Sequence, residues 1–162
     1  MKFDLEKIVR ALADHEVEFV ILGGVAVSIY SSAYVTYDFD VCYSRSSENL
    51  KRIVAALAPF NPRFRGFPDD LPFFWDERTL LNGTNFTLVT DIGDVDLLGE
   101  VSGVGTFAEA VKNSIQIDLL GTQAHILSLE DLIKAKRAAG RPKDLNVLPE
   151  LIALQEALTD ED

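Results

Sequence analysis

Cysteine is nearly absent from this sequence: Cys42 is the only one among 162 residues, so no internal disulfide bond can form. A chain of this kind suits a reducing compartment, and we expect a cytoplasmic protein. Long apolar runs are also lacking, because no stretch approaches the roughly 18 residues that a membrane span needs. The first 19 residues carry charges throughout, unlike a signal peptide. The sequence therefore predicts no association with a membrane.

Positive charge is scarce as well, since 15 Lys and Arg residues stand against 26 Asp and Glu residues and the net charge is −11. Such a surface repels the phosphate backbone of nucleic acids at long range, which disfavours non-specific binding of DNA or RNA. Five basic residues nevertheless fall close together near the C-terminal end. They are Lys134, Lys136, Arg137, Arg141 and Lys143.

The rest of the composition is typical of a globular protein, with 48% hydrophobic and 25% charged residues. A chain of this length suits one domain with a sizeable core, so we expect residues 1–162 to form a single domain. Within it we expect an N-terminal helix in 1–16, a sheet core in 17–127 and C-terminal helices in 128–158.

Periodicity, capping residues and breakers predict the individual elements. We expect helices over residues 4–15, 25–31 and 107–112, and a last helix with Pro149 in its first turn. Ser46 or Ser47 can cap a further helix whose apolar stripe runs from Leu50 to Leu57, and Ser128 can cap another that stops at Gly140. We expect strands over residues 18–22, 37–43, 85–90, 94–98, 114–120 and 125–127. Residues 59–83 hold four of the six prolines and predict an irregular segment without helix. This order predicts an α/β (α+β) fold, with a mixed β-sheet flanked by helices and the C-terminal helices packed on the core.

Two aspartates, Asp38 and Asp40, interrupt an otherwise good strand pattern. The period of two places both carboxylates on one face, with Cα atoms about 6–7 Å apart. Two such anions repel one another unless a cation lies between them, and hard oxygen ligands suit Mg²⁺ or Mn²⁺. The alternative is that both side chains point to solvent from an edge strand.

A second strand repeats the pattern with Asp94 and Asp96. Only one of them need face the first pair to complete a three-carboxylate metal site of the kind that transfers phosphoryl groups. We expect Asp96 to do so, because it lies deeper in the strand, whereas Asp94 borders the Gly93 turn as an ordinary hairpin-end residue. Asp118 is a further alternative for the third carboxylate.

A pair of glycines, Gly23-Gly24, closes the first strand and opens a helix. Glycine lets the backbone approach a phosphate group, and a helix N-terminus presents unpaired N–H groups to it. The alternative is an ordinary tight turn.

Taken together, these motifs resemble a known superfamily. Gly23-Gly24, a short helix and Thr36-Tyr-Asp38-Phe-Asp40-Val resemble the signature of DNA-polymerase-β-like nucleotidyltransferases. Residues 85–88, 93–100 and 127–144, the last with Gly140-Arg-Pro-Lys-Asp144, resemble a small bacterial group. That group is related to the AbiEii-type toxins and minimal nucleotidyltransferases of toxin–antitoxin systems. The resemblance spans roughly residues 17–157.

The resemblance implies roles for particular residues. Asp38, Asp40 and Asp96 match the catalytic ligands of Mg²⁺ or Mn²⁺, and Asp96 also matches the group that orients or deprotonates the acceptor hydroxyl. Gly23 and Gly24 match the turn that binds the nucleotide's phosphates. Many relatives have serine at the second position of this pair.

Other nucleotide-binding roles follow from the same resemblance and from charge. Thr36 is a partial replacement for the serine hydroxyl that Gly24 lacks. Lys136 and Lys143 match the group's pattern and are candidates for a triphosphate clamp, with Asp144 paired to Arg141. The alternative is that these cations only stabilise the C-terminus of a helix.

The implied function is transfer of a nucleoside monophosphate from a nucleoside triphosphate to a hydroxyl, with release of pyrophosphate, within a toxin–antitoxin system. The acceptor is a protein hydroxyl, a tRNA end or a small molecule, and the short chain leaves room for a protein partner to supply part of the site. One alternative is a catalytically weak binding module that acts as an antitoxin-like protein partner. Another is a metal-dependent phosphohydrolase.

Overall fold

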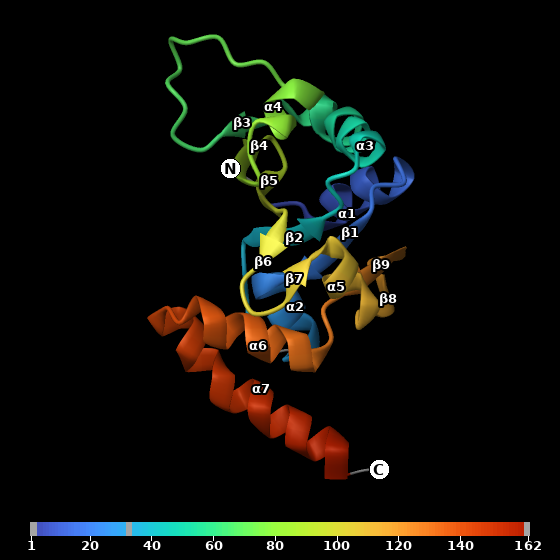
Figure 1. The fold of residues 1–162 in the computed structure, drawn as a ribbon, viewed down its shortest axis with the longest axis vertical. Helices are drawn as coiled ribbons and strands as arrows, with labels where there is room; N and C mark the ends of the chain where they lie inside the picture. Colours follow the sequence, from blue (N-terminus) through green and yellow to red (C-terminus); the bar gives the residue numbers. More distant parts are fainter. Residues whose placement is uncertain (1–2, 32–33, 161–162) are drawn as a thin grey trace.

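The computed structural model describes residues 3–31 and 34–160. Helices and strands alternate along most of the chain (Figure 1). In chain order they are α1 (Leu5–Asp14), β1 (Phe19–Leu22), α2 (Gly23–Tyr30), β2 (Asp38–Tyr43), α3 (Ser47–Leu57), a 3₁₀ turn (Ala58–Phe60), β3 (Arg63–Phe64), α4 (Glu77–Leu81), β4 (Asn85–Thr90), β5 (Gly93–Leu98), β6 (Glu100–Val101), β7 (Gly105–Thr106), α5 (Phe107–Lys112), β8 (Ile115–Leu119), β9 (Thr122–Ile126), α6 (Leu129–Ala139) and α7 (Pro142–Asp160).

The described residues form a seven-stranded sheet in the order β3-β4-β5-β2-β1-β9-β8, with β6 and β7 as a separate small hairpin. Strand β2 runs parallel to β5 and antiparallel to β1, and β1 runs parallel to β9. The sheet is therefore mixed, as the sequence predicts. Because β2 lies between β1 and β5, its aspartates do not sit on an edge strand.

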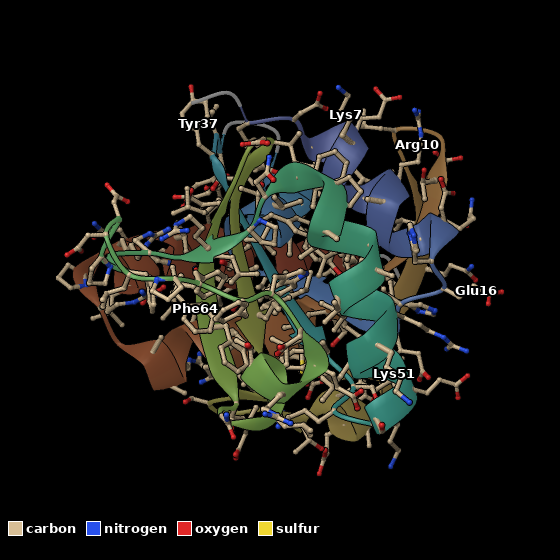
Figure 2. All side chains as sticks on the ribbon, turned by 90° about the horizontal axis from the view of Figure 1, so that it is seen from above. Lys7, Arg10, Glu16, Tyr37, Lys51 and Phe64 are labelled. Carbon is tan, nitrogen blue, oxygen red and sulfur yellow. The ribbon has the colours of Figure 1, made fainter. Side chains whose placement is uncertain are left out.

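Helices lie on both sides of this sheet. Figure 1 shows α3 and α4 at the end of the molecule that holds β3 and β4, and α2, α6 and α7 below β2, and Figure 2 shows α3 beside the strands. Alternation along β2 sends Phe39 and Val41 into the fully buried core, while Asp38 and Asp40 point to the opposite face. One face of β2 thus packs in the apolar core, and the other face carries the two aspartates. In the described part of the chain, no helix is both long and apolar enough to cross a bilayer.

Capping residues set several helix ends where the sequence predicts them. Ser46 accepts a hydrogen bond from the Asn49 backbone N–H at the start of α3, and Ser128 accepts one from Asp131 at the start of α6. Helix α6 ends at Gly140, whose φ of 64° lies in the left-handed region that glycine adopts without strain. The predicted helix over residues 107–112 is also present as α5.

Three sequence expectations about local structure are wrong. Helix α2 begins at Gly23 rather than at Val25, so the glycine pair that is expected to open the helix forms its first turn. The segment 59–83 contains α4, because Asp76 caps a short helix that buries Leu80. The last helix begins at Pro142 rather than near Pro149, which lies inside α7.

A buried side chain, Asn49 of α3, ties the ends of β1 and β2 together. Its Oδ1 accepts a hydrogen bond from the Glu18 N–H (2.7 Å), and its Nδ2 donates to the backbone oxygens of Glu18 (3.2 Å) and Ser44 (2.8 Å). We expect Asn49→Ala to lower the free energy of unfolding by about 2–4 kcal/mol, because it leaves buried backbone groups without partners. Urea unfolding measures this.

The matched control is Asn146→Ala on the exposed side of α7, which should change the free energy of unfolding by less than about 0.5 kcal/mol. Similar losses in the two variants would show that the Asn49 hydrogen bonds do not hold the strands together.

Candidate active site

Four aspartates form two rungs across the parallel strands β2 and β5. Asp38 lies opposite Asp94, and Asp40 lies opposite Asp96. The side chains of directly opposed residues in a sheet share one face, so the register brings four carboxylates onto the charged face of these two strands. The sequence predicts that Asp38, Asp40 and Asp96 converge; it does not predict that Asp94 stands level with Asp38.

Burial and like charge act together on the Asp40–Asp96 rung. The pKa of Asp40 rises from 3.8 to about 7, first because the group is buried, then through a side-chain hydrogen bond with Asp96 and the negative charges of Asp96 and Asp38. The positive charge of Lys136 opposes this rise. Two carboxylates held this close favour a shared proton or a bound cation.

The same two carboxylates have unsatisfied oxygens. Oδ1 of Asp40 and Oδ1 of Asp96 are buried and have no hydrogen-bond partner. Buried polar atoms in folded proteins nearly always have one, so an unpartnered carboxylate oxygen suits a metal ion. The chemistry of the donors therefore fits Mg²⁺ or Mn²⁺.

The third predicted ligand, Asp38, lies at the exposed end of β2. Across residues 3–31 and 34–160, no three His, Cys, Asp or Glu side chains converge as a closed metal-binding group. Asp38 still borders the same cavity as Asp40 and Asp96.

The glycine pair packs directly against this charged face. A Cβ atom built on Gly23 would lie 2.0 Å from Oδ2 of Asp40, and Gly23 has a φ of +66°. A Cβ on Gly24 would lie 2.4 Å from Oγ1 of Thr36. Any side chain at either position would collide, so only glycine lets the start of α2 approach the aspartates. The Thr36 hydroxyl occupies the space into which a serine at position 24 would extend.

A cluster of ion pairs around the buried Asp144 faces the aspartates from the end of α6 and the start of α7. Lys136 Nζ donates to Oδ1 of Asp144 (3.0 Å), and Arg141 Nε donates to Oδ2 (2.6 Å). Asp144 is fully buried. Burial alone raises the pKa of Asp144, but the hydrogen bonds and positive charges of Arg141 and Lys136 outweigh it and lower the pKa to about 2. Asp144 is thus ionised and holds two cations in place, which confirms the predicted pairing with Arg141.

These groups line one cavity of about 320 Å³, within the range of small-molecule sites. All eight predicted site residues border it. They are Gly23, Gly24, Thr36, Asp38, Asp40, Asp96, Lys136 and Lys143. Tyr34, Asn85, Glu100 and Ser102 border it as well, and the sequence pattern did not single them out.

The alternatives for the third carboxylate lie elsewhere. Asp118 is on β8 at the far end of the sheet, where it accepts a hydrogen bond from the Gly121 N–H. Asp94 accepts a hydrogen bond from Arg65 (2.7 Å) and does not line this cavity. Of the candidate third carboxylates, Asp96 is therefore the one beside Asp40.

Comparisons with solved structures show which fold this is. A protein of Thermotoga maritima assigned as a nucleotidyltransferase superposes with a TM-score of 0.58 at 17% identity, over 92% of this chain and 90% of that one. ANT(2″)-Ia in complex with adenylyl-2″-tobramycin superposes with a TM-score of 0.58 at 15% identity, over 97% and 95%. The solution structure of the antibiotic-resistance factor ANT(2″)-Ia gives 0.57 at 14%, over 97% and 90%.

No family model and no curated protein sequence matches the chain. At these low identities the structural likeness establishes the fold, and the chain has the nucleotidyltransferase fold. The fold expected from the sequence resemblance is confirmed.

The raised pKa of Asp40 predicts how stability depends on pH in the metal-free protein. Between 3.8 and about 7, the folded protein holds a proton at Asp40 that the unfolded chain has released. The free energy of unfolding therefore falls as the pH rises through this window. Asp40→Asn cannot ionise, so in EDTA we expect its melting temperature to exceed that of the wild type by about 5 °C at pH 8 and by much less at pH 5.

The control is Asp118→Asn, which removes a carboxylate from an exposed hairpin and should follow the wild type at both pH values. Equal melting temperatures for Asp40→Asn and the wild type at pH 8 would contradict a destabilising charge at Asp40.

Proposed function

We propose that the protein is a metal-dependent nucleotidyltransferase that moves a nucleoside monophosphate from a nucleoside triphosphate to a hydroxyl group. The observation that carries the proposal is the pairing of Asp40 with Asp96 on neighbouring strands, beside Gly23. Each of the two carboxylates has one buried oxygen without a hydrogen-bond partner. The cavity beside them holds the anchored cations Lys136 and Arg141 on its other wall. Carboxylates for metal and cations for phosphate thus face each other across one space.

The triphosphate fits between these two walls. Gly23 and Gly24 at the start of α2 line the cavity, and the unpaired backbone N–H groups of a helix N-terminus can donate to phosphate oxygens. Lys136 and Arg141 offer positive charge to the leaving pyrophosphate, and the exposed Lys143 adds a third cation at the rim. Thr36 presents its hydroxyl beside Gly24.

In the transfer step, the acceptor oxygen forms a bond to the α-phosphorus while the bond to pyrophosphate breaks. Asp96 accepts the proton of the attacking hydroxyl. Asp38 and Asp40, together with Asp96, are the residues that would hold a divalent metal ion. Mg²⁺ or Mn²⁺ bound by the three carboxylates supplies positive charge that offsets the charge developing on the phosphoryl oxygens. The protein's contribution is positioning and electrostatics.

The sequence resemblance adds a biological setting to this proposal, namely a toxin–antitoxin system in the cytoplasm with a protein partner. The catalytically weak, antitoxin-like binding module is the competing candidate. It differs in one measurable respect, because it would bind a nucleoside triphosphate without transferring label to any acceptor.

Asp96→Asn tests the catalytic assignment. With α-labelled nucleoside triphosphates, Mg²⁺ and cell extract, the wild type should label an acceptor, and Asp96→Asn should lower the initial rate at least about 100-fold. The chain offers a matched control, because Asp118 stands in the same local sequence, Asp-Leu-Leu-Gly, but lies away from the cavity. Asp118→Asn should label at the wild-type rate.

Two outcomes would refute the proposal. One is titration calorimetry that detects no binding of any nucleoside triphosphate with Mg²⁺. The other is equal binding by the wild type and by Asp38→Ala combined with Asp40→Ala.

Asp144→Asn tests the clamp. Because Asp144 holds Lys136 and Arg141, we expect its loss to raise the dissociation constant for a Mg²⁺–nucleoside triphosphate about 10-fold, measured by calorimetry. Lys136→Met should weaken binding similarly while Asp144 keeps its Arg141 partner, which guards against a simple folding defect.

The control is Asp131→Asn. Asp131 is also buried and also lies beside a lysine, Lys134, but it does not line the cavity. Equal weakening in Asp131→Asn and Lys136→Met would mean that the basic cluster only stabilises the helices.

A further inference from the structure

The cavity that holds the aspartates continues into an apolar slot. One wall of the slot is formed by Leu98 of β5 and Val101 of β6, and the other by Leu132, Ala135 and Ala139 of α6. All five side chains are hydrocarbon, so none of them can bind a metal ion or a phosphate group. The transfer step proposed above therefore gives this part of the cavity no role.

The β6–β7 hairpin packs against α6 beside this slot (Figure 1). A Cβ built on Gly103 in the hairpin turn would lie 2.7 Å from the backbone oxygen of Lys134, so the hairpin and the helix are in direct contact. On the helix surface, Ala135 and Ala139 lie between that contact and Lys136, because each residue turns by about 100° around the axis. Their short side chains leave the space that forms the slot.

The slot begins where the nucleoside would leave the aspartates. Asp96, Leu98 and Glu100 follow one another at a spacing of two residues, and all three border the cavity. At a rise of about 3.3 Å per residue, Leu98 lies about 7 Å beyond Asp96, and Glu100 lies at most about 13 Å beyond it. With the α-phosphate at Asp96, the ribose would lie beside Leu98 and the far edge of the base beside Glu100.

A nucleobase suits the shape of this slot. It is the part of a nucleoside triphosphate that presents two flat, largely apolar faces, and both faces lose contact with water between the two hydrocarbon walls. The triphosphate belongs at the opposite, charged side of the cavity, beside Gly23 and Lys136. The two parts of one ligand thus match the two parts of one cavity.

Glu100 provides polar recognition at the far end of the slot. The Gly99 N–H donates to the Thr84 oxygen (3.1 Å) and to Oδ1 of Asn85 (2.9 Å), and Glu100 pairs with Thr106 in the hairpin, so the backbone here is fixed. The Glu100 side chain is exposed, and within residues 3–31 and 34–160 it forms no ion pair. An ionised carboxylate only accepts hydrogen bonds, so it selects a base by the N–H groups on the edge of that base.

The four common bases differ in how they meet a carboxylate. Guanine presents N1–H and the N2 amino group side by side, and these two donors can bind both oxygens of one carboxylate. Adenine and cytosine each offer a single amino group. Uracil offers one N–H between two carbonyl oxygens, which the carboxylate repels. Paired hydrogen bonds to a charged group are the strongest of these arrangements, so guanine fits Glu100 best.

We propose that the apolar slot takes the nucleobase and that Glu100 selects guanine, which makes a guanosine triphosphate the preferred donor. This inference rests on the proposed nucleotidyl transfer, for which it names the donor substrate. The faces of the guanine ring contact the walls formed by β5, β6 and α6. Its N1–H and N2 amino group donate to the carboxylate of Glu100, while the triphosphate lies beside Gly23 and Lys136.

Calorimetry on the full chain with Mg²⁺ compares the four nucleoside triphosphates. We expect the dissociation constant for GTP to be at least about 5-fold lower than those for ATP and CTP and about 20-fold lower than that for UTP, because only guanine makes paired hydrogen bonds with Glu100. Inorganic tripolyphosphate serves as the probe that lacks a base.

Glu100→Gln tests the selection of the base. The amide keeps one acceptor oxygen and replaces the other by a donor, so we expect GTP binding to weaken about 10-fold and ATP binding to change less than about 2-fold. The matched control is Glu156→Gln, an exposed change of the same kind in α7 and outside the cavity, which should bind both nucleotides like the wild type.

Ala139→Phe tests the slot itself. The added ring occupies the space of the base, so GTP binding should weaken at least about 10-fold while tripolyphosphate binding stays unchanged. Ala139 is exposed, which guards against a folding defect. Ala153→Phe, at an exposed alanine of α7 outside the cavity, should bind GTP like the wild type.

Three results would overturn the inference. They are equal binding of the four nucleoside triphosphates or a preference for a base other than guanine, unchanged GTP binding by Glu100→Gln or Ala139→Phe, and equal loss of GTP and tripolyphosphate binding in Ala139→Phe. Failure of the proposed function is distinguishable, because the wild type would then bind no nucleoside triphosphate or would bind GTP without labelling any acceptor.

Discussion

The pairing of Asp40 with Asp96 is the constraint to which the rest of the molecule is fitted. Two carboxylates stand opposite each other on adjacent strands, partly buried, each with an oxygen that no protein group satisfies. Folding brings these like charges together at a cost in free energy, which appears as a pKa of about 7 for Asp40. A cation between the two carboxylates would relieve their repulsion. The same repulsion therefore destabilises the metal-free protein and favours metal binding.

The surrounding structure offsets this electrostatic repulsion and places groups that suit phosphate binding around the two carboxylates. The opposite face of β2 is fully buried apolar surface, which keeps the strands in register whatever the charge on the other face. Gly23 lets the start of α2 contact Asp40, and Asp144 fixes Lys136 and Arg141 across the cavity. Lys136 and Arg141 are therefore separated from Asp40 and Asp96 by the cavity rather than paired with them directly. A metal–triphosphate complex carries both signs of charge and could fill this space.

Much of the site could be predicted from the sequence because its signals are local. A period of two determines that Asp38 and Asp40 share a face, and a glycine pair at the start of a helix determines a close approach of the backbone. Other features depend on distant pairing. The position of Asp94 level with Asp38 follows from the register of strands some fifty residues apart in sequence, and α7 continues through Pro149 because Leu148 and Leu151 are buried on either side of it. Neither the strand register nor the continuation of α7 can be predicted from the periodicity of a single segment.

The most direct measurement of the central claim is anomalous X-ray scattering from crystals grown with Mn²⁺ and a non-hydrolysable nucleoside triphosphate analogue. The account predicts a manganese peak about 2 Å from carboxylate oxygens of Asp40 and Asp96, with Asp38 turned inward to the same ion. Manganese found elsewhere on the molecule, with the Asp40–Asp96 rung bare beside a bound nucleotide, would contradict it.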